Sequence, residues 1–597
     1  MPTYRAPVED FRFILTELYD VAPVLAYPAY AEVSPDLMLS VVEEAGKFCE
    51  GVFSPLNASG DAEGCRWESG VVHTPTGFRD AYRQYAEGGW IGLSADPEHG
   101  GQGLPLMLRY VVDEMVVGAN LSLAMYPGLT QGAYEAIHTH GSAELKHRYL
   151  PRLTSGQWAG TMCLTEAHAG TDLGMIRTRA QQLDDGTYRV TGQKIFITAG
   201  EHDLTENIIH LVLAKLPGAA AGTKGISMFL VPKFIPNPDG SLGARNAVTC
   251  GSIEHKMGIK GSATCVLNFD GAVGYLVGEE GKGMRAMFTM MNSARLGVGI
   301  QGLGLATNAY HNAVAYARER LQGRSLSGAK NPEGPADPII VHAETRRSLL
   351  QMRAFIEGAR ALATWTGMLI DQEFRDPDEA RRQEAADLVA LLTPIIKAFF
   401  TDLGFETTNI GLQLFGGHGY IREWGMEQFV RDARIGQIYE GTNHVQALDL
   451  VGRKLPEGNG RLLQRYLAIV SAELEAGGRV ASLAPHVAAL SQAVDALRQA
   501  TAFIAQRAAA NADEAGAAAN DYLRLFGYVA LGHQWLRTAR VATEKLAEGG
   551  AFPAAHYEAK LATAGFWFAR MMPQVGALHA TIAAGADAVL AMPLDSF

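Results

Sequence analysis

The sequence contains few cysteines, and they do not cluster. The five cysteines, Cys49, Cys65, Cys163, Cys250 and Cys265, are an odd number spread along 597 residues, and no Cys-x-x-Cys pair is present. This pattern indicates neither a disulfide framework nor a zinc site, so we predict no metal site. We expect the protein to work in a reducing cytoplasm.

The sequence also lacks an excess of basic residues. Lys and Arg number 51 against 63 Asp and Glu, which gives a net charge of −12 and a pI near 5.8. Such a chain repels a phosphate backbone, because binding to nucleic acid rests largely on Lys and Arg contacts to phosphates. The composition therefore argues against a nucleic-acid partner.

No hydrophobic run is long enough to predict a membrane span. The N-terminus begins Met1-Pro2-Thr3-Tyr4-Arg5 and continues into acidic residues, so no secretory signal is expected. The most apolar long stretch, Leu388 to Phe400, contains Pro394 and Lys397. It is shorter than the ~20 residues that cross a bilayer. We expect it to be a buried helix.

The apolar residues, 48% of the chain, suffice for several folded units. Helical spacing of apolar residues predicts an N-terminal helical domain at 1–157, a helical domain at 283–457, and a further helical domain at 458–597 after a Gly- and Pro-containing linker. Between them, at 158–282, four short runs typical of strands are separated by Gly, Asp and Pro: Tyr188–Val190, Ile208–Ala214, Gly225–Val231 and Val266–Phe269. The predicted class is α+β, mainly α, with a middle β domain.

Two motifs invite assignments that their context does not support. The residues from Gly297 to Gly302 match Gly-x-Gly-x-x-Gly, but a dinucleotide fingerprint must follow a strand, and here the preceding residues are helical. We expect these glycines to allow close helix packing. His138 and His140 are two residues apart and do not share a helix face, so we interpret them as part of a surface turn rather than a metal site.

Five other motifs gain meaning from their order. They cover Thr165–Asp172, Gly192–Thr198, Gly278–Met284, Gln413–Tyr420 and Tyr439–Thr442. Each alone is compatible with a polar loop or a turn. Together, across roughly residues 30 to 453, they resemble the acyl-CoA dehydrogenase family of flavoenzymes. The resemblance implies an N-terminal helical domain, a middle β-barrel domain and a C-terminal four-helix domain, to which this chain adds an extra C-terminal helical domain.

The resemblance also implies FAD contacts at particular positions. Near the flavin and its diphosphate it places Thr165, Gly170 and Thr171, and against the isoalloxazine it places Phe196 and Thr198. The first loop departs from the family pattern. It has Ala167 and His168 where many members have Pro and a small residue, and Thr171 where Ser is usual. We expect the side chain of His168 to face solvent.

A second group of residues is implied to reach the FAD diphosphate of a neighbouring subunit. Its members are Arg320, Gln413 and Gly417, and Thr442 is a further cofactor contact. A guanidinium suits phosphate, because it stays charged and offers two parallel donors. Without the other motifs, Arg320 would be interpreted as an ordinary solvated charge on a helix.

The resemblance makes Glu440 the catalytic base. The family reaction removes a proton from the carbon α to a thioester, which requires a carboxylate and hydrogen-bond donors at the thioester oxygen. The amide of this same Glu is implied to be one such donor, and Gly441 permits a close approach to substrate. The alternative is that Glu440 caps a helix beginning near Thr442.

Some family members carry the base at a helix position that corresponds to Ala294 here. Alanine cannot carry a proton, so Glu440 is the matched candidate. The next residue, Arg295, is interpreted as either a structural residue or a contact to substrate near the thioester.

The sequence therefore predicts FAD-dependent oxidation of an acyl-CoA to a trans-2-enoyl-CoA, with electrons passing to an electron-transferring flavoprotein. The extra C-terminal domain and the opening residues from Tyr4 to Asp10 resemble a long bacterial subgroup that acts on 3-methylmercaptopropionyl-CoA in dimethylsulfoniopropionate breakdown. We expect a cytoplasmic homodimer. Rival interpretations are a fatty acyl-CoA dehydrogenase of β-oxidation, an acyl-CoA oxidase, a DNA-associated relative and a helical scaffold.

Overall fold

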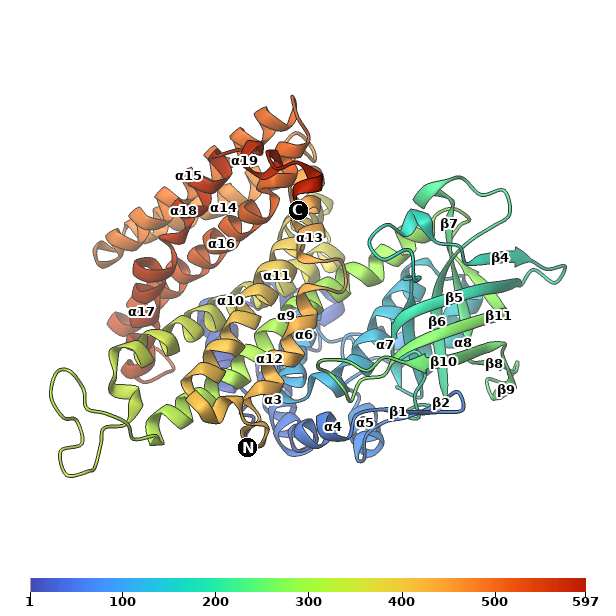
Figure 1. The fold of residues 1–597 in the computed structure, drawn as a ribbon, viewed down its shortest axis with the longest axis horizontal. Coiled ribbons are helices and arrows are strands. Elements are labelled where there is room, and N and C mark those ends of the chain that lie inside the picture. The colour runs from blue at the N-terminus through green and yellow to red at the C-terminus, as the bar shows by residue number, and fades with distance from the viewer. Residues whose placement is uncertain (1) are drawn as a thin grey trace. The chain divides into compact units, whose positions relative to one another are not determined.

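The computed structural model describes residues 2–597, which form two compact units. The mixed unit contains residues 48–105 and 119–297, and the helical unit contains residues up to Lys47, 106–118 and 298–597. The helix–strand–helix succession expected from the sequence, with additional C-terminal helices, is confirmed (Figure 1). The division of the chain into domains at residues 157, 282 and 457 stays a prediction.

The mixed unit combines short helices with a seven-stranded sheet and two small two-stranded sheets. Its helices are α4 (Asn57–Glu63), α5 (Phe78–Glu87), α7 (Leu121–His140) and α8 (Ala143–Thr154). Its strands are β1 (Arg66–Glu68), β2 (Val71–His73), β3 (Trp158–Cys163), β4 (Arg179–Gln182), β5 (Tyr188–Thr198), β6 (Asn207–Lys215), β7 (Ile226–Pro232), β8 (Phe234–Pro236), β9 (Leu242–Arg245), β10 (Val248–Ile253) and β11 (Thr264–Val277). Three of the four predicted strand-like runs lie wholly in these strands, and the fourth, Gly225–Val231, begins one residue before β7.

The pairing of the large sheet closes a barrel. Strand β5 pairs antiparallel with β4 and β11, β11 pairs with β7, and β7 pairs with β6. The ring closes where Arg179 of β4 meets Lys215 of β6 in a parallel bridge. Along β5, buried and exposed residues largely alternate, whereas the mostly apolar β7, which pairs with β11 and with β6, is buried throughout. The β-barrel expected from the sequence is therefore present.

The histidine pair does not lie in a turn. His138 and His140 occupy the last turn of α7, where the His138 ring stacks on Tyr134 with the ring centroids 5.5 Å apart. His140 Nε2 is 2.8 Å from the hydroxyl of Thr289. The prediction of a surface turn was wrong because α7 continues to the residue before Gly141.

The helical unit consists of long helices with short connections. Its helices are α1 (Val8–Phe13), α2 (Ala22–Leu25), α3 (Pro35–Phe48), α6 (Leu106–Ala119), α9 (Gly283–Glu319, which begins in the mixed unit), α10 (Ala343–Arg375), α11 (Glu379–Leu414), α12 (Met426–Arg434), α13 (Asn443–Asp449), α14 (Arg461–Gly478), α15 (Ala484–Ala508), α16 (Asp513–Glu548), α17 (Ala554–Phe566), α18 (Gln574–Ala583) and α19 (Asp587–Leu590). Short 3₁₀ and π segments link several of them.

Glycines let α9 approach α11 closely. A Cβ atom added to Gly302 would lie 2.6 Å from the carbonyl oxygen of Phe400, and one added to Gly299 would lie 2.7 Å from Cγ2 of Ile396. Both distances are too short for a real side chain, so only glycine fits. The packing role predicted for the glycines that follow Gly297 is confirmed.

Helix α11 forms the centre of the helical unit. Among residues 2–597 it is the one helix long and apolar enough to cross a membrane, but 78% of its most apolar window is buried, which makes it weak evidence for a span. The stretch from Leu388 to Phe400 lies inside it, almost wholly buried, as expected. The helix extends well beyond that stretch at both ends.

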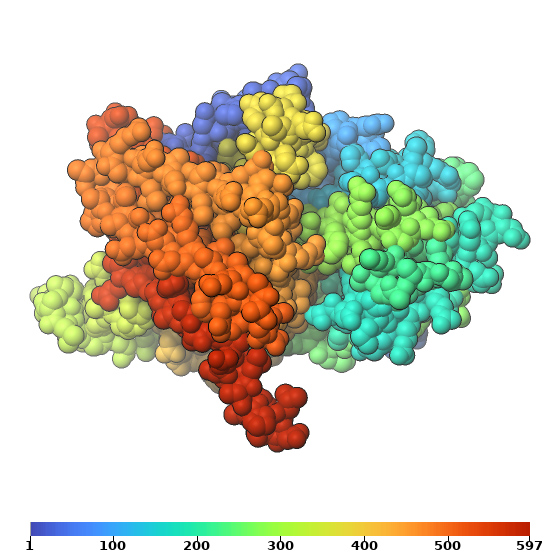
Figure 2. All heavy atoms as spheres, turned by 90° about the horizontal axis from the view of Figure 1, so that it is seen from above, coloured from blue at the N-terminus to red at the C-terminus, as the bar shows by residue number. Residues whose placement is uncertain are grey.

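Of the helices after residue 458, α14, α16 and α17 pack against α10 or α11, and α15 and α18 pack on α16 (Figure 1). Trp535 of α16 donates its indole N–H to the carbonyl of Ala354, at 2.9 Å. Arg461 and Arg465 of α14 both contact the buried carboxylate of Asp387, at 2.7 and 2.6 Å. The last residues, in dark red in Figure 2, project from the surface of this unit and expose the side chains of Val589, Leu590, Met592, Leu594 and Phe597.

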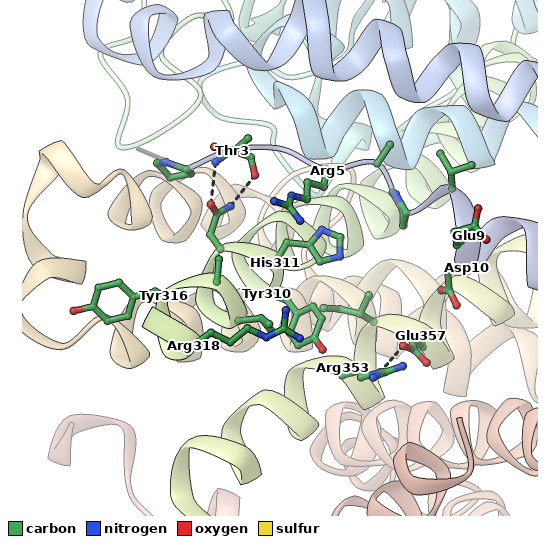
Figure 3. A pocket seen from close by; sticks show the side chains of 18 of the residues that line it. Thr3, Arg5, Glu9, Asp10, Tyr310, His311, Tyr316, Arg318, Arg353 and Glu357 are labelled. Carbon is green, nitrogen blue, oxygen red and sulfur yellow. Dashed lines mark hydrogen bonds and ion pairs between the residues drawn. The ribbon is translucent and has the colours of Figure 1, made fainter. Parts of the chain in front are cut away.

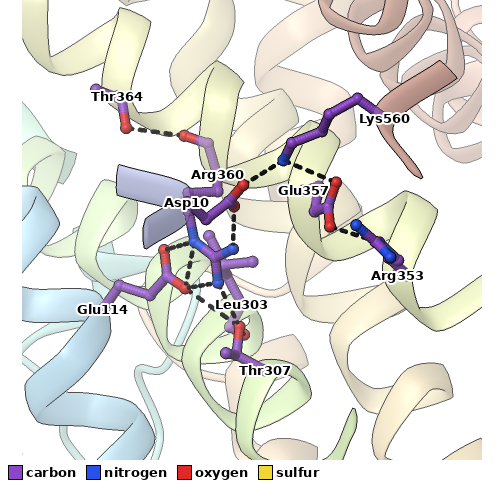
Figure 4. Close-up of polar contacts among 9 residues, drawn as sticks. All are labelled: Asp10, Glu114, Leu303, Thr307, Arg353, Glu357, Arg360, Thr364 and Lys560. Carbon is purple, nitrogen blue, oxygen red and sulfur yellow. Dashed lines mark hydrogen bonds and ion pairs between the residues drawn. The ribbon is translucent and has the colours of Figure 1, made fainter. Parts of the chain in front are cut away.

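A buried charge network joins four helices of this unit (Figure 4). Arg360 of α10 holds Glu114 of α6, with Nε 3.0 Å from the carboxylate, and also contacts Asp10 of α1. Lys560 of α17 bonds Asp10 and lies 2.9 Å from Glu357. Burial alone would raise the pKa of Asp10, but the charges of Lys560 and Arg360 hold it well below its usual range.

Four of the five cysteines are buried, and Cys65 is half-buried. Burial raises the pKa of the Cys65 thiol to about 11 and that of Cys163 to about 12. All five thiols are free.

Candidate active site

The predicted site residues fall into two groups, one in each unit. In the mixed unit, Thr165, Gly170 and Thr171 lie on the loop that follows β3, and Phe196 and Thr198 lie at the end of β5. The amide of Ile195 donates to the carbonyl of Thr165, at 2.9 Å, so the loop begins directly beside the strand end that carries Phe196. The structure thus brings these two predicted motifs together.

A buried ion pair fixes the loop after β3, which we call the flavin loop (residues 164–178). Lys194 of β5 is fully buried, and its Nζ donates to Glu166 Oε1 at 2.9 Å and to the carbonyl of Leu164 at 2.8 Å. The other donors to the Glu166 carboxylate are the amides of Arg177 and Thr178, at 2.7 and 3.0 Å, and the Thr178 hydroxyl, at 2.6 Å. Both ends of the loop are therefore tied to one carboxylate.

This network determines the charge state of Glu166. Burial alone would raise the pKa of Glu166, but the charge of Lys194 and the donors from Thr178 and Arg177 lower it to about 2. Sequence reasoning missed the pair, although a lysine two residues before Phe196 on a strand with alternating burial was a usable signal.

The mixed unit offers surfaces that fit a flavin. Phe196 has a left-handed backbone, with φ of +58°, and its side chain is 59% exposed. A large aromatic residue left exposed in a strained conformation is typical of a functional surface. A Cβ added to Gly170 would contact nothing within 4 Å, so the loop has open space there for phosphate groups. The hydroxyls of Thr165 and Thr171 supply donors on the same loop.

His168 lies on the outer side of the flavin loop. Its side chain is 31% exposed, and Nε2 is 3.1 Å from the carbonyl of Met175. The same nitrogen lies 3.6 Å from Glu166 Oε2. The side chain is thus partly exposed and also bridges two parts of the loop, which the sequence did not predict.

In the helical unit, the residues implied to reach a neighbouring subunit lie on the surface. Arg320 directly follows α9, Gln413 lies near the end of α11, and Gly417 lies in the 3₁₀ turn Gly416–Tyr420; all three are exposed. A Cβ added to Gly417 would meet nothing within 4 Å. Their exposure suits contact with a molecule outside this chain.

The predicted base lies on a short loop between the 3₁₀ turn Ile435–Gln437 and α13. Glu440 has a φ of +56° and Gly441 a φ of +84°, so two consecutive residues are left-handed. For a non-glycine residue this conformation costs ~1–2 kcal/mol and needs support from the surrounding structure. The Glu440 side chain is half-buried.

The alternative role of Glu440 as a helix cap is wrong. Helix α13 begins at Asn443, and its N-cap is Thr442, whose hydroxyl accepts a hydrogen bond from the amide of Val445 at 3.3 Å. The capping function is thus carried by the hydroxyl residue, as is usual at helix starts. The Glu440 carboxylate is not used as a cap.

Buried polar side chains from α11 and α13 hydrogen-bond the loop that carries Glu440. Lys397 of α11 donates from Nζ to the carbonyl of Gly441 and to Asn443 Oδ1, both at 2.8 Å. Gln446 of α13 donates to the carbonyl of Glu440, at 3.1 Å. None of these contacts was predicted from the sequence.

Arg295 belongs to the mixed unit, on α9. It is 7% exposed, and its guanidinium carbon is 5.8 Å from the centroid of the Phe288 ring. A guanidinium over an aromatic face within ~6 Å is a cation–π arrangement. Arg295 is thus a buried cation beside Ala294, which leaves its role near substrate a prediction.

A cavity of 710 Å³ lies in the helical unit, and Phe415 of the motif Gln413–Tyr420 is among the residues that line it. The N-terminal segment that contains Thr3 and Arg5 forms one wall, and α9 and α10 form the other, with His311 and Arg353 pointing inward (Figure 3). Arg353 is paired with Glu357, at 2.6 Å. Arg318 and Glu319, which directly precede Arg320, also line this cavity, but none of the predicted site residues does.

Comparison with known proteins agrees with these motifs. Four family models match in order: "Acyl-CoA dehydrogenase, N-terminal domain" at 39–157, "middle domain" at 161–272, "C-terminal domain" at 281–455, and "Acetyl-CoA dehydrogenase C-terminal like" at 465–593. The matches cover nearly the whole chain.

Individual relatives match along their full length. A 3-methylmercaptopropionyl-CoA dehydrogenase from Ruegeria pomeroyi is 42% identical over 99% of this chain and 100% of the relative. A butyryl-CoA dehydrogenase from Syntrophomonas wolfei is 36% identical over 100% and 99%. A Bacillus anthracis acyl-CoA dehydrogenase structure aligns with a TM-score of 0.74 at 22% identity, over 96% of this chain and 92% of that one, which supports the fold. The chain therefore belongs to the acyl-CoA dehydrogenase family of FAD-dependent oxidoreductases.

Proposed function

We propose that this enzyme converts an acyl-CoA thioester to a trans-2-enoyl-CoA with Glu440 as the base that removes the α proton. The observation that carries this proposal is the left-handed backbone at Glu440, which buried donors from α11 and α13 hold in place. Backbone strain at a carboxylate residue whose loop is fixed by buried donors indicates a functional role.

The chemistry requires a carboxylate and an oxyanion donor close together. The α proton is weakly acidic until the thioester oxygen is polarised, so a backbone amide directed at that oxygen lowers the barrier to proton removal. The Glu440 amide can serve as this donor, and Gly441 leaves room for the substrate to approach. When bound, FAD accepts the hydride that leaves the β carbon.

The two residue groups would hold the cofactor in different ways. Thr165, Gly170 and Thr171 would bind the flavin and its diphosphate, with Phe196 and Thr198 against the isoalloxazine. From a second copy of the chain, Arg320, Gln413 and Gly417 would reach the diphosphate, which supports a homodimer. Thr442 can still donate its hydroxyl hydrogen to the cofactor, since its cap uses only an acceptor lone pair.

For the substrate we propose 3-methylmercaptopropionyl-CoA, formed in dimethylsulfoniopropionate breakdown, and an electron-transferring flavoprotein as the electron acceptor in the cytoplasm. The 42% identity to the dehydrogenase of that name supports this choice. Because sulfur and methylene are similar in size, and discrimination of a whole methylene is worth only ~1–3 kcal/mol, we expect overlapping activity on short straight-chain acyl-CoAs. Arg295 and Gly441 would contact the substrate near the thioester.

The test of the base is Glu440→Gln, which preserves shape and removes the proton acceptor. We expect FAD to remain bound and substrate to bleach the flavin at least ~10²–10⁴-fold more slowly under anaerobic conditions. Glu423→Gln, an exposed carboxylate in the same unit, is the control and should behave as wild type. Rapid bleaching by Glu440→Gln would overturn the assignment.

The substrate is tested by comparing kcat/KM on the thioether substrate with butanoyl-, hexanoyl- and hexadecanoyl-CoA. A strong preference for hexadecanoyl-CoA with negligible thioether activity would move the enzyme to long-chain β-oxidation. Rapid oxygen consumption during turnover would instead favour an acyl-CoA oxidase.

A further inference from the structure

The side chain of Lys397 is a cation buried in the most apolar helix of the protein. Its exposed fraction is 0%, and its neighbours Ile395, Ile396, Phe399 and Phe400 are also buried. Removing an ammonium group from water costs several kcal/mol unless hydrogen bonds compensate it. Its Nζ donates hydrogen bonds to the carbonyl of Gly441 and to Asn443 Oδ1. Both acceptors belong to the loop and helix start that directly follow Glu440.

The backbone conformation of this loop depends on where its carbonyls point. In a left-handed stretch, as in any helical one, successive carbonyls point one way and the amides point the opposite way. The Glu440 carbonyl accepts from Gln446, at 3.1 Å, and the Gly441 carbonyl accepts from Lys397, at 2.8 Å. Fixing both carbonyls toward α11 and α13 therefore fixes the direction of the Glu440 amide and of its Cα–Cβ bond.

The second acceptor of Lys397 is itself anchored. Asn443 donates from Nδ2 to Asp402 Oδ1 at 2.7 Å and lies 3.0 Å from the Thr401 hydroxyl, and both of these residues are on α11. Lys397 thus contacts two points of the loop, of which Asn443 is held independently and Gly441 is held by Lys397 and, at a longer 3.4 Å, by Gln446. The Gly441 carbonyl is the point that Lys397 controls.

We propose that Lys397 is a positioning residue for Glu440, and that it acts through the carbonyl of Gly441. The proposal rests on the proposed role of Glu440 as the base. Loss of the lysine frees the Gly441 carbonyl and lets the strained loop relax, which displaces the carboxylate and the oxyanion amide together. A displacement of ~1 Å in a catalytic group can lower a rate by ~10²-fold.

The experiment compares Lys397→Met with Lys560→Met in the holoenzyme. Methionine matches the lysine stem in length and volume and removes only the ammonium group. We expect Lys397→Met to lower kcat by ~10²-fold with KM and FAD content unchanged. The isotope effect on kcat for α-dideuterated acyl-CoA should rise, because proton removal becomes the slow step. Lys560 is an equally buried lysine in the charge network, and Lys560→Met should lower Tm while leaving kcat and the isotope effect as in wild type.

A double variant separates this proposal from the proposed function. In Glu440→Gln, adding Lys397→Met should cause a much smaller loss than the ~10²-fold expected in the wild type, because the carboxylate is already gone and only the oxyanion amide is displaced. If Glu440→Gln alone turns over normally, the proposed function fails, whatever Lys397 does. If Glu440→Gln is inactive but Lys397→Met shows wild-type kcat and isotope effect, the positioning role is overturned.

A second variant guards against a folding defect in Lys397→Met. Asn443→Ala removes one acceptor of Lys397 and leaves the lysine and Gly441 in place. We expect a smaller loss of kcat, about 10-fold, again with a larger isotope effect. An unchanged isotope effect in Asn443→Ala, together with a fall in FAD content in Lys397→Met, would assign Lys397 to the fold alone and overturn the proposal.

Discussion

Replacing Lys194 by methionine removes one charge from the buried pair that holds the flavin loop. The variant leaves Glu166 with its amide and hydroxyl donors from Arg177 and Thr178 but without the ammonium, and it frees the carbonyl of Leu164. Both charged side chains are almost fully buried, with 0% and 5% exposure, so solvent cannot replace the lost partner. We expect the loop to open locally rather than the whole barrel to unfold.

The size of the effect follows from two independent routes. Breaking a buried ion pair by removing one partner costs ~3–5 kcal/mol. The fall of the Glu166 pKa from 4.5 to about 2 corresponds to about 3 kcal/mol, of which Lys194 supplies the largest favourable share. About 3 kcal/mol is about a 10²-fold change in the opening equilibrium of residues 164–178.

Hydrogen exchange read by mass spectrometry measures that opening directly. Peptides from the flavin loop should exchange about 10²-fold faster in Lys194→Met, and FAD should bind more weakly, because the loop must be reordered on binding. Lys233→Met is the control: this lysine of the same unit pairs with Glu201, so its loss should not alter exchange in the flavin loop. Adding Glu166→Gln to Lys194→Met should restore part of the protection. Wild-type exchange and FAD affinity in Lys194→Met would refute the argument.

Three further outcomes follow from the same structure. Arg360→Met should lower the free energy of unfolding by ~3–5 kcal/mol. Glu114→Gln should lower it less, because burial raises the pKa of Glu114 in spite of Arg360 and so makes the neutral form less costly. Urea melts of both variants measure the difference. Gly302→Ala should destabilise by ~1–3 kcal/mol through the clash with α11, while Gly297→Ala, with open space around it, should be neutral or stabilising in the same melts. The stability that Glu166 contributes should be complete above its ordinary pKa of 4.5 and be lost as pH falls towards 2; acid titrations of wild type and Glu166→Gln should differ by this component, and identical curves would contradict it.

The sequence predicted well what depends on periodicity and on motif order. The apolar run at Leu388–Phe400 indicated a helix, because such a run is buried on all sides. The pattern around Tyr188–Val190 indicated a strand that is buried on one face. The close packing at Gly302 was also predictable, because a glycine inside a helix needs a reason such as a neighbouring backbone. The motifs located the candidate site residues but not what holds them.

What the sequence could not predict are contacts between residues far apart in the chain. Lys397 lies 43 residues before Glu440, so its bond to the Gly441 carbonyl depends on how α11 meets the loop. Glu440 was the alternative candidate for the cap of α13, but the cap is Thr442. The left-handed residues Glu440 and Gly441 lie before the helix, which begins at Asn443. A lysine inside an apolar run was nevertheless a visible signal, since a buried charge requires a partner.

The burial of the native thiols has a practical consequence for spectroscopy. A maleimide reacts with an accessible thiolate. Burial raises the pKa values of Cys65 and Cys163, whereas the hydrogen bond with Cys265 lowers the pKa of Cys250, and the Cys250 thiol is protected by its burial. A single cysteine introduced at an exposed position, such as Asn459 or Leu594, should therefore accept a fluorophore without removal of the native cysteines. A dye at either position would report on the C-terminal helices while turnover is followed in the same sample.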